Sequence, residues 1–335
     1  MRYRHLLSVG VAATALASIS AAPAHADNTT NATNPWLDQR VMNMAHSGGE
    51  MEAPTNTMYA FERAVALGSD MIELDVHSTV DEQLVVIHNA TVDETTDGTG
   101  KVEDLTLAEI QTLDAAYNFV PDVGTDPDQP EDAYTLRGVR TGDVAPPDGH
   151  TADDFAAPAL AEVFERFPFT PINIEIKGSG TLDVASFLRT ARLLADFLNA
   201  SGRTDVIVSS FNDLAVSEFH GLAPQIGLAP GTAGIAAYFF TGAKPIDGTV
   251  ALQIPVTLNG WVKIATPKFI ARAHADGYAV HIWFSGTAPD DEATYNELVD
   301  ACADALMPAR PALLERILDD RGITRPGQPG VDPCA

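Results

Sequence analysis

Acidic side chains alternate with aliphatic ones in two short segments of this chain. Glu73 and Asp75 lie within residues 71–76, and Glu175 lies with Lys177 within residues 172–177. Successive side chains of a β-strand point to opposite faces, so each segment has one aliphatic and one charged face. Buried carboxylates are costly unless a cation neutralises them. The pattern therefore predicts a metal site with Glu73, Asp75 and Glu175 as ligands.

Two histidines follow other strand-like segments. His46 comes directly after residues 41–45, and His88 comes directly after residues 84–87. Three carboxylates without cysteine or paired histidine ligands favour a hard cation, Ca²⁺ or Mg²⁺, over zinc. One divalent cation beside two histidines suits cleavage of a phosphate ester. One histidine would deprotonate the nucleophile and the other would protonate the leaving group.

The elements that must position these side chains alternate between strand-like and helix-like patterns. Strands are expected at 41–45, 71–76, 84–87, 172–177, 206–209, 226–228, 279–284 and 305–307, and helices at 57–67, 107–113, 184–200, 214–220, 267–275, 295–301 and 312–318. About eight such units predict an α/β fold, a (β/α)₈ TIM barrel, with catalytic side chains at the carboxyl ends of the strands. A doubly wound sheet is disfavoured because no glycine-rich phosphate loop follows the first strand.

The organisation along the chain indicates export. Basic residues near the N-terminus precede the apolar run 6–22 and the small-residue site Ala24-His25-Ala26, so residues 1–26 are predicted to be a cleaved signal peptide. A membrane anchor is disfavoured because the run is short and rich in Ala and Ser. A leader at 27–40, the barrel at 41–320 and a tail at 321–335 follow. Residues 118–157, rich in Asp, Pro and Gly, form a loop insertion in the barrel.

The charge and the cysteine content of the chain indicate which classes of binding partner and which compartment to expect. The chain has 46 acidic and 20 basic residues, a formal net charge of −26. This excess argues against nucleic acid and anionic lipid, and favours small neutral or zwitterionic substrates. We expect a secreted monomer without a stable membrane anchor. An even cysteine count in an exported protein favours a disulfide between Cys302 and Cys334, with separate thiols as the alternative.

Several motifs occur in a recognisable order along the chain. They are His46-Ser47-Gly48, Pro54-Thr55-Asn56-Thr57, Glu73-Leu74-Asp75, His88-Asn89, Thr95-Thr96-Asp97-Gly98-Thr99-Gly100, Pro158-Ala159-Leu160-Ala161-Glu162-Val163 and Asn173-Ile174-Glu175-Ile176-Lys177. Together they resemble the glycerophosphodiester phosphodiesterase family over residues 41–318. The resemblance implies a (β/α)₈ barrel whose acid–base pair is His46 and His88. It also implies Glu73, Asp75 and Glu175 as metal ligands, and a catalytic Lys177 beside the phosphate.

Two departures from the family pattern bear on specificity. Ser47 stands where the family has Arg, and Thr55 stands where it has Glu. In these departures the chain resembles secreted actinobacterial relatives that act as lysophospholipase D, including the lysoplasmalogen-specific kind. Loss of an Arg near phosphate weakens bidentate anion recognition. Glu50 and Glu52, in the same loop, are candidates to face a cationic head group, with a solvated loop as the alternative.

An aromatic-rich later region supplies candidates for a wall that contacts an apolar chain, with ordinary core packing as the alternative. These candidates are Phe211, Phe239, Phe240, Ile254 and Trp283. We therefore expect a lysophospholipid substrate, lysoplasmalogen or lysophosphatidyl-ethanolamine or -choline, cleaved in a phospholipase D manner. The alternatives are a phosphodiesterase of deacylated glycerophosphodiesters and a non-catalytic barrel that binds a phosphorylated ligand. A glycoside hydrolase is disfavoured by the two histidines and the lysine.

Overall fold

The computed structural model describes residues 34–37, 41–284, 286–325 and 328–334. The expected signal peptide and most of the expected leader therefore lie outside the described residues. Within the described ranges, no helix is both long and apolar enough to cross a membrane.

Parallel strands form a closed barrel. In the described residues, the eight strands of the barrel pair in the order β8-β7-β6-β2-β1-β13-β12-β9. Their bounds are β1 (Met42–Ala45), β2 (Met71–Ser78), β6 (Ile172–Ile176), β7 (Val206–Ser209), β8 (Gly227–Leu228), β9 (Ala251–Pro255), β12 (Ala279–Trp283) and β13 (Ala305–Met307). A bridge between Leu228 and Thr249 links β8 to the segment before β9 and closes the ring. The predicted TIM barrel is thus confirmed.

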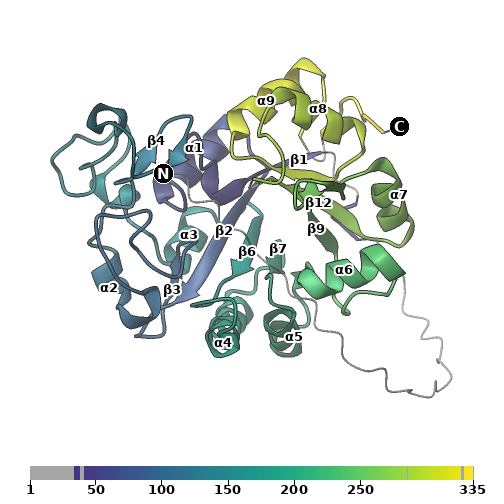
Figure 1. The fold of residues 1–335 in the computed structure, drawn as a ribbon, viewed down its shortest axis with the longest axis horizontal. Helices are drawn as coiled ribbons and strands as arrows, with labels where there is room; N and C mark the ends of the chain where they lie inside the picture. Colours follow the sequence, from purple (N-terminus) through teal and green to yellow (C-terminus); the bar gives the residue numbers. More distant parts are fainter. Residues whose placement is uncertain (1–33, 38–40, 285, 326–327, 335) are drawn as a thin grey trace. The chain divides into compact units, whose positions relative to one another are not determined.

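Helices surround the strands, as Figure 1 shows. They are α1 (Met58–Leu67), α2 (Leu107–Ile110), α3 (Leu160–Arg166), α4 (Val184–Ser201), α5 (Asp213–Leu222), α6 (Thr232–Thr241), α7 (Pro267–Ala275), α8 (Glu292–Asp300) and α9 (Pro311–Asp320). Several begin at a side chain that accepts a hydrogen bond from the first turn, including Thr57, Asn212, Thr266 and Asp291. Such caps satisfy backbone donors that have no partner within the helix.

The aliphatic faces of the strands are buried under these helices. Ile72, Leu74 and Val76 of β2 are fully buried and belong to one apolar cluster with Ile172 and Ile174 of β6. Burial of each such side chain contributes about 1.5–3 kcal/mol. The alternation in sequence therefore turns the charged positions of the same strands toward the barrel interior.

One predicted strand is not part of the barrel. β3 (Leu84–Val86) pairs antiparallel with β2, with Val76 opposite Val86. The barrel strand absent from the prediction is β9, which contains Ile254, a candidate from the sequence for the wall of an apolar pocket. The error has a physical origin, because short aliphatic runs look alike whether they form a barrel strand or the return strand of a hairpin.

The segment 118–157 lies beside the loop that follows β1. It contains the hairpin β4 (Phe119–Val120) and β5 (Gly124–Thr125), and two 3₁₀ turns, η3 (Glu131–Ala133) and η4 (Ala152–Phe155). The Asp122 backbone N–H donates to the carbonyl of Met51 at 2.8 Å, and Arg310 donates to the Asp122 carbonyl at 3.0 Å. The first contact fixes the segment against the loop that carries His46, and the second fixes it to the connection between β13 and α9.

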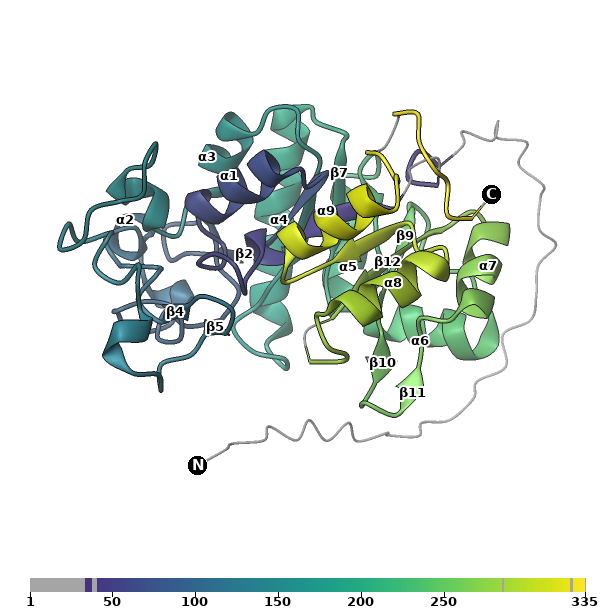
Figure 2. The same ribbon diagram turned by 90° about the horizontal axis from the view of Figure 1, so that it is seen from above.

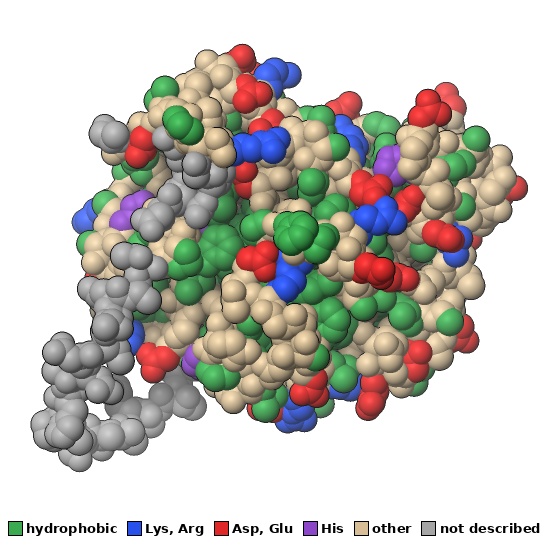
Figure 3. Space-filling model, turned by 180° about the vertical axis from the view of Figure 1, so that it is seen from behind, with side chains coloured by type: hydrophobic (Ala, Val, Ile, Leu, Met, Phe, Trp, Pro, Cys, Tyr) green, Lys and Arg blue, Asp and Glu red, His purple; other side chains and the backbone are tan. Residues whose placement is uncertain are grey.

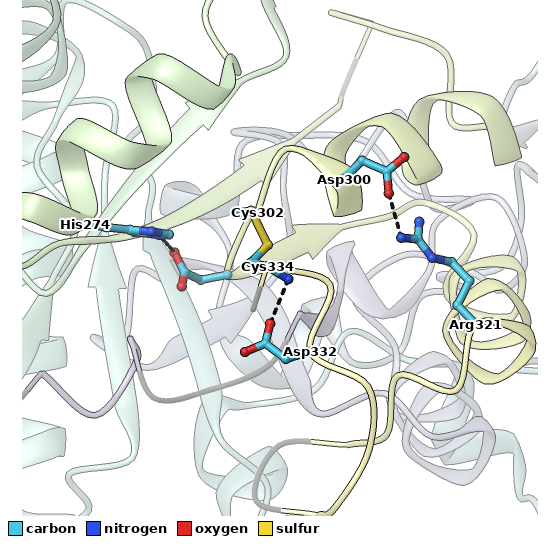
Figure 4. The surroundings of a disulfide bond; sticks show 7 residues. His274, Asp300, Cys302, Arg321, Asp332 and Cys334 are labelled. Atoms are coloured by element: carbon cyan, nitrogen blue, oxygen red, sulfur yellow. Dashed lines mark hydrogen bonds and ion pairs between the residues drawn. A yellow bond between two sulfur atoms is a disulfide. The ribbon is translucent and has the colours of Figure 1, made fainter.

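A disulfide joins Cys302 and Cys334, as predicted, with their Cα atoms 5.7 Å apart. It ties the tail to the turn between α8 and β13 (Figure 4). Nearby, Arg321 pairs with Asp300 at 2.6 Å, which holds the start of the tail to α8.

On the face opposite to that of Figure 1, acidic side chains are dispersed among apolar and basic ones (Figure 3).

Candidate active site

Three carboxylates from two neighbouring strands converge inside the barrel. β2 and β6 pair in parallel with Asp75 opposite Glu175, so Glu73, Asp75 and Glu175 share the inward face. Glu73 and Asp75 are buried, and Glu175 is partly buried. One oxygen atom of each carboxylate lies within 4.8 Å of the others. The sequence pattern placed these three groups on one face, and the register of the strands brings them together.

A lysine neutralises part of this charge. The Lys177 Nζ lies 3.0 Å from Asp75 Oδ1 and 2.8 Å from Glu175 Oε1. Burial opposes the charged form of Lys177, but the two carboxylates outweigh it and raise its pKa. Burial also opposes the charged form of Asp75, but Lys177 and the two histidines, His88 and His46, outweigh it and lower its pKa.

Lys177 compensates the charges of Asp75 and Glu175, whereas the cationic neighbour of Glu73 is His46, 4.0 Å away. Burial, and then the neighbouring charge of Asp75, raise the pKa of Glu73 well above its ordinary value. A buried oxygen cluster with an excess of negative charge is the donor set that Ca²⁺ or Mg²⁺ prefers. The residues present therefore fit one hard divalent cation, and the ligand roles of Glu73, Asp75 and Glu175 stay a prediction.

His46 follows β1 and begins the 3₁₀ turn η1 (His46–Gly48). Its Nδ1 lies 3.1 Å from Glu50 Oε1, and its Nε2 lies 4.0 Å from Glu73 Oε2. Burial alone would lower the pKa of His46, but Glu50, Glu73 and Asp75 raise it to about 10. Glu50 thus holds one ring nitrogen, while the other faces the carboxylate cluster. Glu50, a candidate from the sequence for contact with a cationic head group or for a solvated loop, contacts His46, and the sequence pattern did not indicate this contact.

Ser47 and Asn56 hold the carboxylates in place, and sequence reasoning assigned neither of them this role. The Ser47 N–H donates to Glu73 at 2.8 Å, and its hydroxyl donates to Asp75 at 3.2 Å. The Asn56 amide donates to Asp75 at 2.9 Å. Both residues have a positive φ, 48° and 56°, an uncommon conformation outside glycine. The available signal was their place in the His46–Gly48 and Pro54–Thr57 motifs.

His88 follows β3 and is exposed at the edge of the cluster. A positive charge on its ring lowers the pKa values of Glu50 and Asp75, so His88 acts on both carboxylates through electrostatics, while its Nδ1 lies 2.5 Å from Asn89 Oδ1. Its backbone carbonyl lies 3.2 Å from His77 Nε2. Burial lowers the pKa of His77 to about 4, so this ring is a neutral structural group. The β2–β3 hairpin therefore brings His88 to the cluster.

One of the predicted substrate residues, Phe211, lies beside Lys177, and a second, Trp283, lies against Phe211. Phe211 follows β7, and its ring centroid is 5.8 Å from Lys177 Nζ. Trp283 ends β12 and meets Phe211 edge to face, with centroids 5.7 Å apart. Phe211 is 55% exposed. This aromatic pair, Phe211–Trp283, forms an apolar border next to the charged cluster.

The remaining predicted substrate residues lie elsewhere. Glu52 pairs with Arg63 of α1 at 2.6 Å and accepts from the Ala312 N–H at 3.3 Å, so it joins α1 to α9 instead of facing a ligand. Ile254 is fully buried in the apolar cluster under the outer helices, because its position in β9 points outward.

Phe239 and Phe240 lie on α6, on the outside of the barrel. Phe239 packs against Phe269 of α7, with centroids 5.6 Å apart, and Phe240 stacks edge to face on Phe239. The apolar wall predicted from sequence is thereby reduced to Phe211 and Trp283.

The chain is similar to a known family of phosphodiesterases. Residues 46–311 match the model of the glycerophosphoryl diester phosphodiesterase family. A glycerophosphodiester phosphodiesterase from Caldanaerobacter subterraneus is 36% identical over 185 residues, which cover 55% of this chain and 63% of that protein. A protein named lysophospholipase D GDPD1, from Rattus norvegicus, is 38% identical over 138 residues, which cover 40% of this chain and 35% of that protein. The chain thus matches less than two thirds of the length of either relative.

The fold is shared with a solved structure. A phosphodiesterase from Oleispira antarctica, in complex with the product sn-glycerol-3-phosphate, superposes with a TM-score of 0.60 at 21% identity. The superposition covers 84% of this chain and 97% of that one.

Proposed function

The chain belongs to the glycerophosphoryl diester phosphodiesterase family, and we propose that it hydrolyses phosphodiesters with the help of one divalent cation. One observation carries the proposal. The carboxylates of Glu73, Asp75 and Glu175 meet Lys177 inside the barrel mouth, with His46 beside them. Packing alone gives no reason to bury such a group of charges.

The roles follow from the positions of these groups. Glu73, Asp75 and Glu175 would hold the cation, Ca²⁺ or Mg²⁺, which polarises phosphoryl oxygens when it is bound. Lys177 would lie beside the phosphate as a fixed positive charge. His46 and His88 would act as the acid–base pair, one taking the proton of the nucleophile and the other protonating the leaving alkoxide. Glu50 would orient His46 through its contact with Nδ1.

For the substrate we propose a lysophospholipid, lysoplasmalogen or lysophosphatidyl-ethanolamine or -choline. The partly exposed Phe211 lies within 5.8 Å of the Lys177 ammonium, so an apolar chain could leave the phosphate site along the Phe211–Trp283 pair. Burying each methylene there would contribute about 0.8 kcal/mol. The name of the rat relative, a lysophospholipase D, supports this class.

Cleavage in a phospholipase D manner would release free choline or ethanolamine and leave the phosphate on the glycerol. The second candidate is hydrolysis of deacylated glycerophosphodiesters, which the name of the Caldanaerobacter relative supports. We further propose that the protein is secreted and monomeric. The basic and apolar N-terminal residues and the Cys302–Cys334 disulfide support export, because disulfides persist in oxidising compartments.

The test is product analysis before and after removal of metal. The purified chain is assayed on lysophosphatidylethanolamine and on glycerophosphoethanolamine, with phosphorus-31 NMR of the products. We expect a higher kcat/KM for the lysophospholipid, release of free ethanolamine, loss of activity after chelation, and recovery with calcium or magnesium.

A different result would contradict each part of the proposal. Full activity of the metal-stripped protein would remove the cation from the mechanism. Phosphoethanolamine as the product would show that the other P–O bond breaks. Binding of either diester without turnover would leave a non-catalytic barrel.

A further inference from the structure

A short hairpin projects apolar side chains into solvent. It consists of β10 (Thr257–Leu258) and β11 (Val262–Lys263). Trp261 is 91% exposed, and its neighbours Leu258 and Val262 are exposed too. A tryptophan this exposed and flanked by exposed aliphatic residues is uncommon on a protein surface that faces only water.

The turn of this hairpin has a defined shape. The Trp261 N–H donates to the Leu258 carbonyl at 3.2 Å, and the two central residues, Asn259 and Gly260, have φ values of 52° and 71°. Asn-Gly with positive φ at both positions is the preferred sequence of a type I′ turn. The hairpin therefore presents Trp261 from a regular turn.

The hairpin lies at the same end of the barrel as the candidate active site. It belongs to the connection from the carboxyl end of β9 to α7, and carboxyl ends of the barrel strands carry the site. Figure 2 shows it on the same side as the β4–β5 hairpin, which packs beside the His46 loop.

The loops that follow the neighbouring barrel strands β6 and β7 carry further exposed apolar side chains. Leu182, which is 94% exposed, lies between β6 and α4, and the exposed Leu214 lies at the start of α5, after β7. The apolar side chains thus follow β6, β7 and β9, which lie on one arc of the barrel. Phe211 also follows β7, and its ring centroid is 5.8 Å from Lys177 Nζ.

The charge at this end of the barrel favours one kind of lipid. The segment 118–157 contains nine acidic and two basic residues. Anionic lipid would be repelled by these carboxylates, whereas zwitterionic phospholipids present their ammonium groups outermost. Tryptophan is well suited to this position, because its ring is apolar and its N–H can remain hydrated at the interface.

We propose that the β10–β11 hairpin, with Leu182 and Leu214, is the surface by which this protein rests on a zwitterionic lipid aggregate. The substrate would then pass from the lipid phase across Phe211 to Lys177. The biological meaning of this contact rests on the proposed hydrolysis of lysophospholipids, but binding to lipid can be measured without any turnover.

The chain offers a matched control on another surface. Phe169 is 92% exposed and lies between α3 and β6, at the amino end of a barrel strand and so at the end of the barrel opposite the site. Trp261→Ala and Phe169→Ala each remove one exposed ring, and neither residue packs in the core. Sedimentation with vesicles of diacyl phosphatidylcholine compares the two variants with the unmodified chain, and phosphatidylglycerol vesicles test the charge preference.

We expect Trp261→Ala to lower the partition coefficient onto phosphatidylcholine about tenfold, which corresponds to about 1.4 kcal/mol, because the variant has less apolar surface to bury in the lipid. Phe169→Ala should bind as the unmodified chain does, and phosphatidylglycerol should bind more weakly. Equal binding by both variants, or stronger binding to phosphatidylglycerol, would overturn the proposal. So would a protein that does not sediment with phosphatidylcholine at all.

Activity separates this proposal from the proposed function. Trp261→Ala should lower turnover of a micellar lysophospholipid and leave kcat/KM on a monomeric, short-chain diester unchanged. Lipid binding that depends on Trp261, in a protein that hydrolyses no lysophospholipid, would retain the surface and reject the proposed substrate. Hydrolysis of micellar lysophospholipid that Trp261→Ala does not alter would reject the surface and retain the substrate.

Discussion

Glu50 offers the sharpest test of how His46 is tuned. Its Oε1 lies 3.1 Å from His46 Nδ1, and it raises the pKa of that ring. Glu50→Gln keeps the shape and an acceptor oxygen but removes the charge. A hydrogen bond to a charged partner contributes about 1.5–3 kcal/mol, and one pKa unit corresponds to about 1.36 kcal/mol. Because 34% of the Glu50 side chain is exposed, solvent screens part of this effect.

We therefore expect the pKa of His46 to fall by about one unit in Glu50→Gln. Loss of a negative neighbour destabilises the protonated ring, so the limb of the pH–rate profile that reports His46 should move to lower pH by that amount. The assay is kcat/KM as a function of pH at saturating cation, so that the charge of the bound metal is the same in both proteins. The other limb should stay in place.

Glu52→Gln is the matched control, because it removes the same charge two residues further along the loop. Glu52 pairs with Arg63 and not with His46, so this variant should lose some stability and keep both limbs of the profile. If Glu50→Gln leaves both limbs unmoved, or if Glu52→Gln moves a limb as far, the assignment of Glu50 as the partner that positions His46 is wrong.

The other predictions concern the cation, the apolar chain and stability. Asp75→Asn should lower kcat at least about a hundredfold with an unchanged circular dichroism spectrum, because a charged ligand within 3.0 Å of Lys177 is lost; near-normal turnover would contradict the ligand role. Phe211→Ala should reduce kcat/KM more for a long-chain lysophospholipid than for the deacylated diester, and an equal loss on both would remove Phe211 from chain binding. Burial, and then the nearby Asp70, raise the pKa of Glu315 to about 7 from an ordinary value of 4.5, although Asn43 donates to its carboxylate. The folded state therefore binds this proton more tightly than the unfolded state, and the resulting stability is lost as the pH rises through about 7. Glu315→Gln should make the free energy of unfolding, measured with urea at about pH 5 and about pH 7.5, fall less than in the unmodified chain; an unchanged fall would show that Glu315 is not the group responsible.

Local periodicity determined the essential part of the site. The alternation of side chains along a strand is a property of the backbone, so Glu73 and Asp75 had to share a face opposite Ile72 and Leu74 in any fold that keeps this strand. The same holds for Glu175 and Lys177. The alternation of strands and helices likewise determined the barrel class, because each aliphatic face needs a helix to cover it.

Only the tertiary structure distinguishes residues whose local sequence patterns are equivalent. Glu50 and Glu52 have the same charge and lie in one loop, but only the path of that loop brings Glu50 to His46 and Glu52 to Arg63. Phe211 and Trp283 meet across the barrel mouth, whereas Ile254 points into the helical layer. These outcomes depend on contacts between residues far apart in sequence. Such contacts form, and stabilise the protein, only when the barrel has closed.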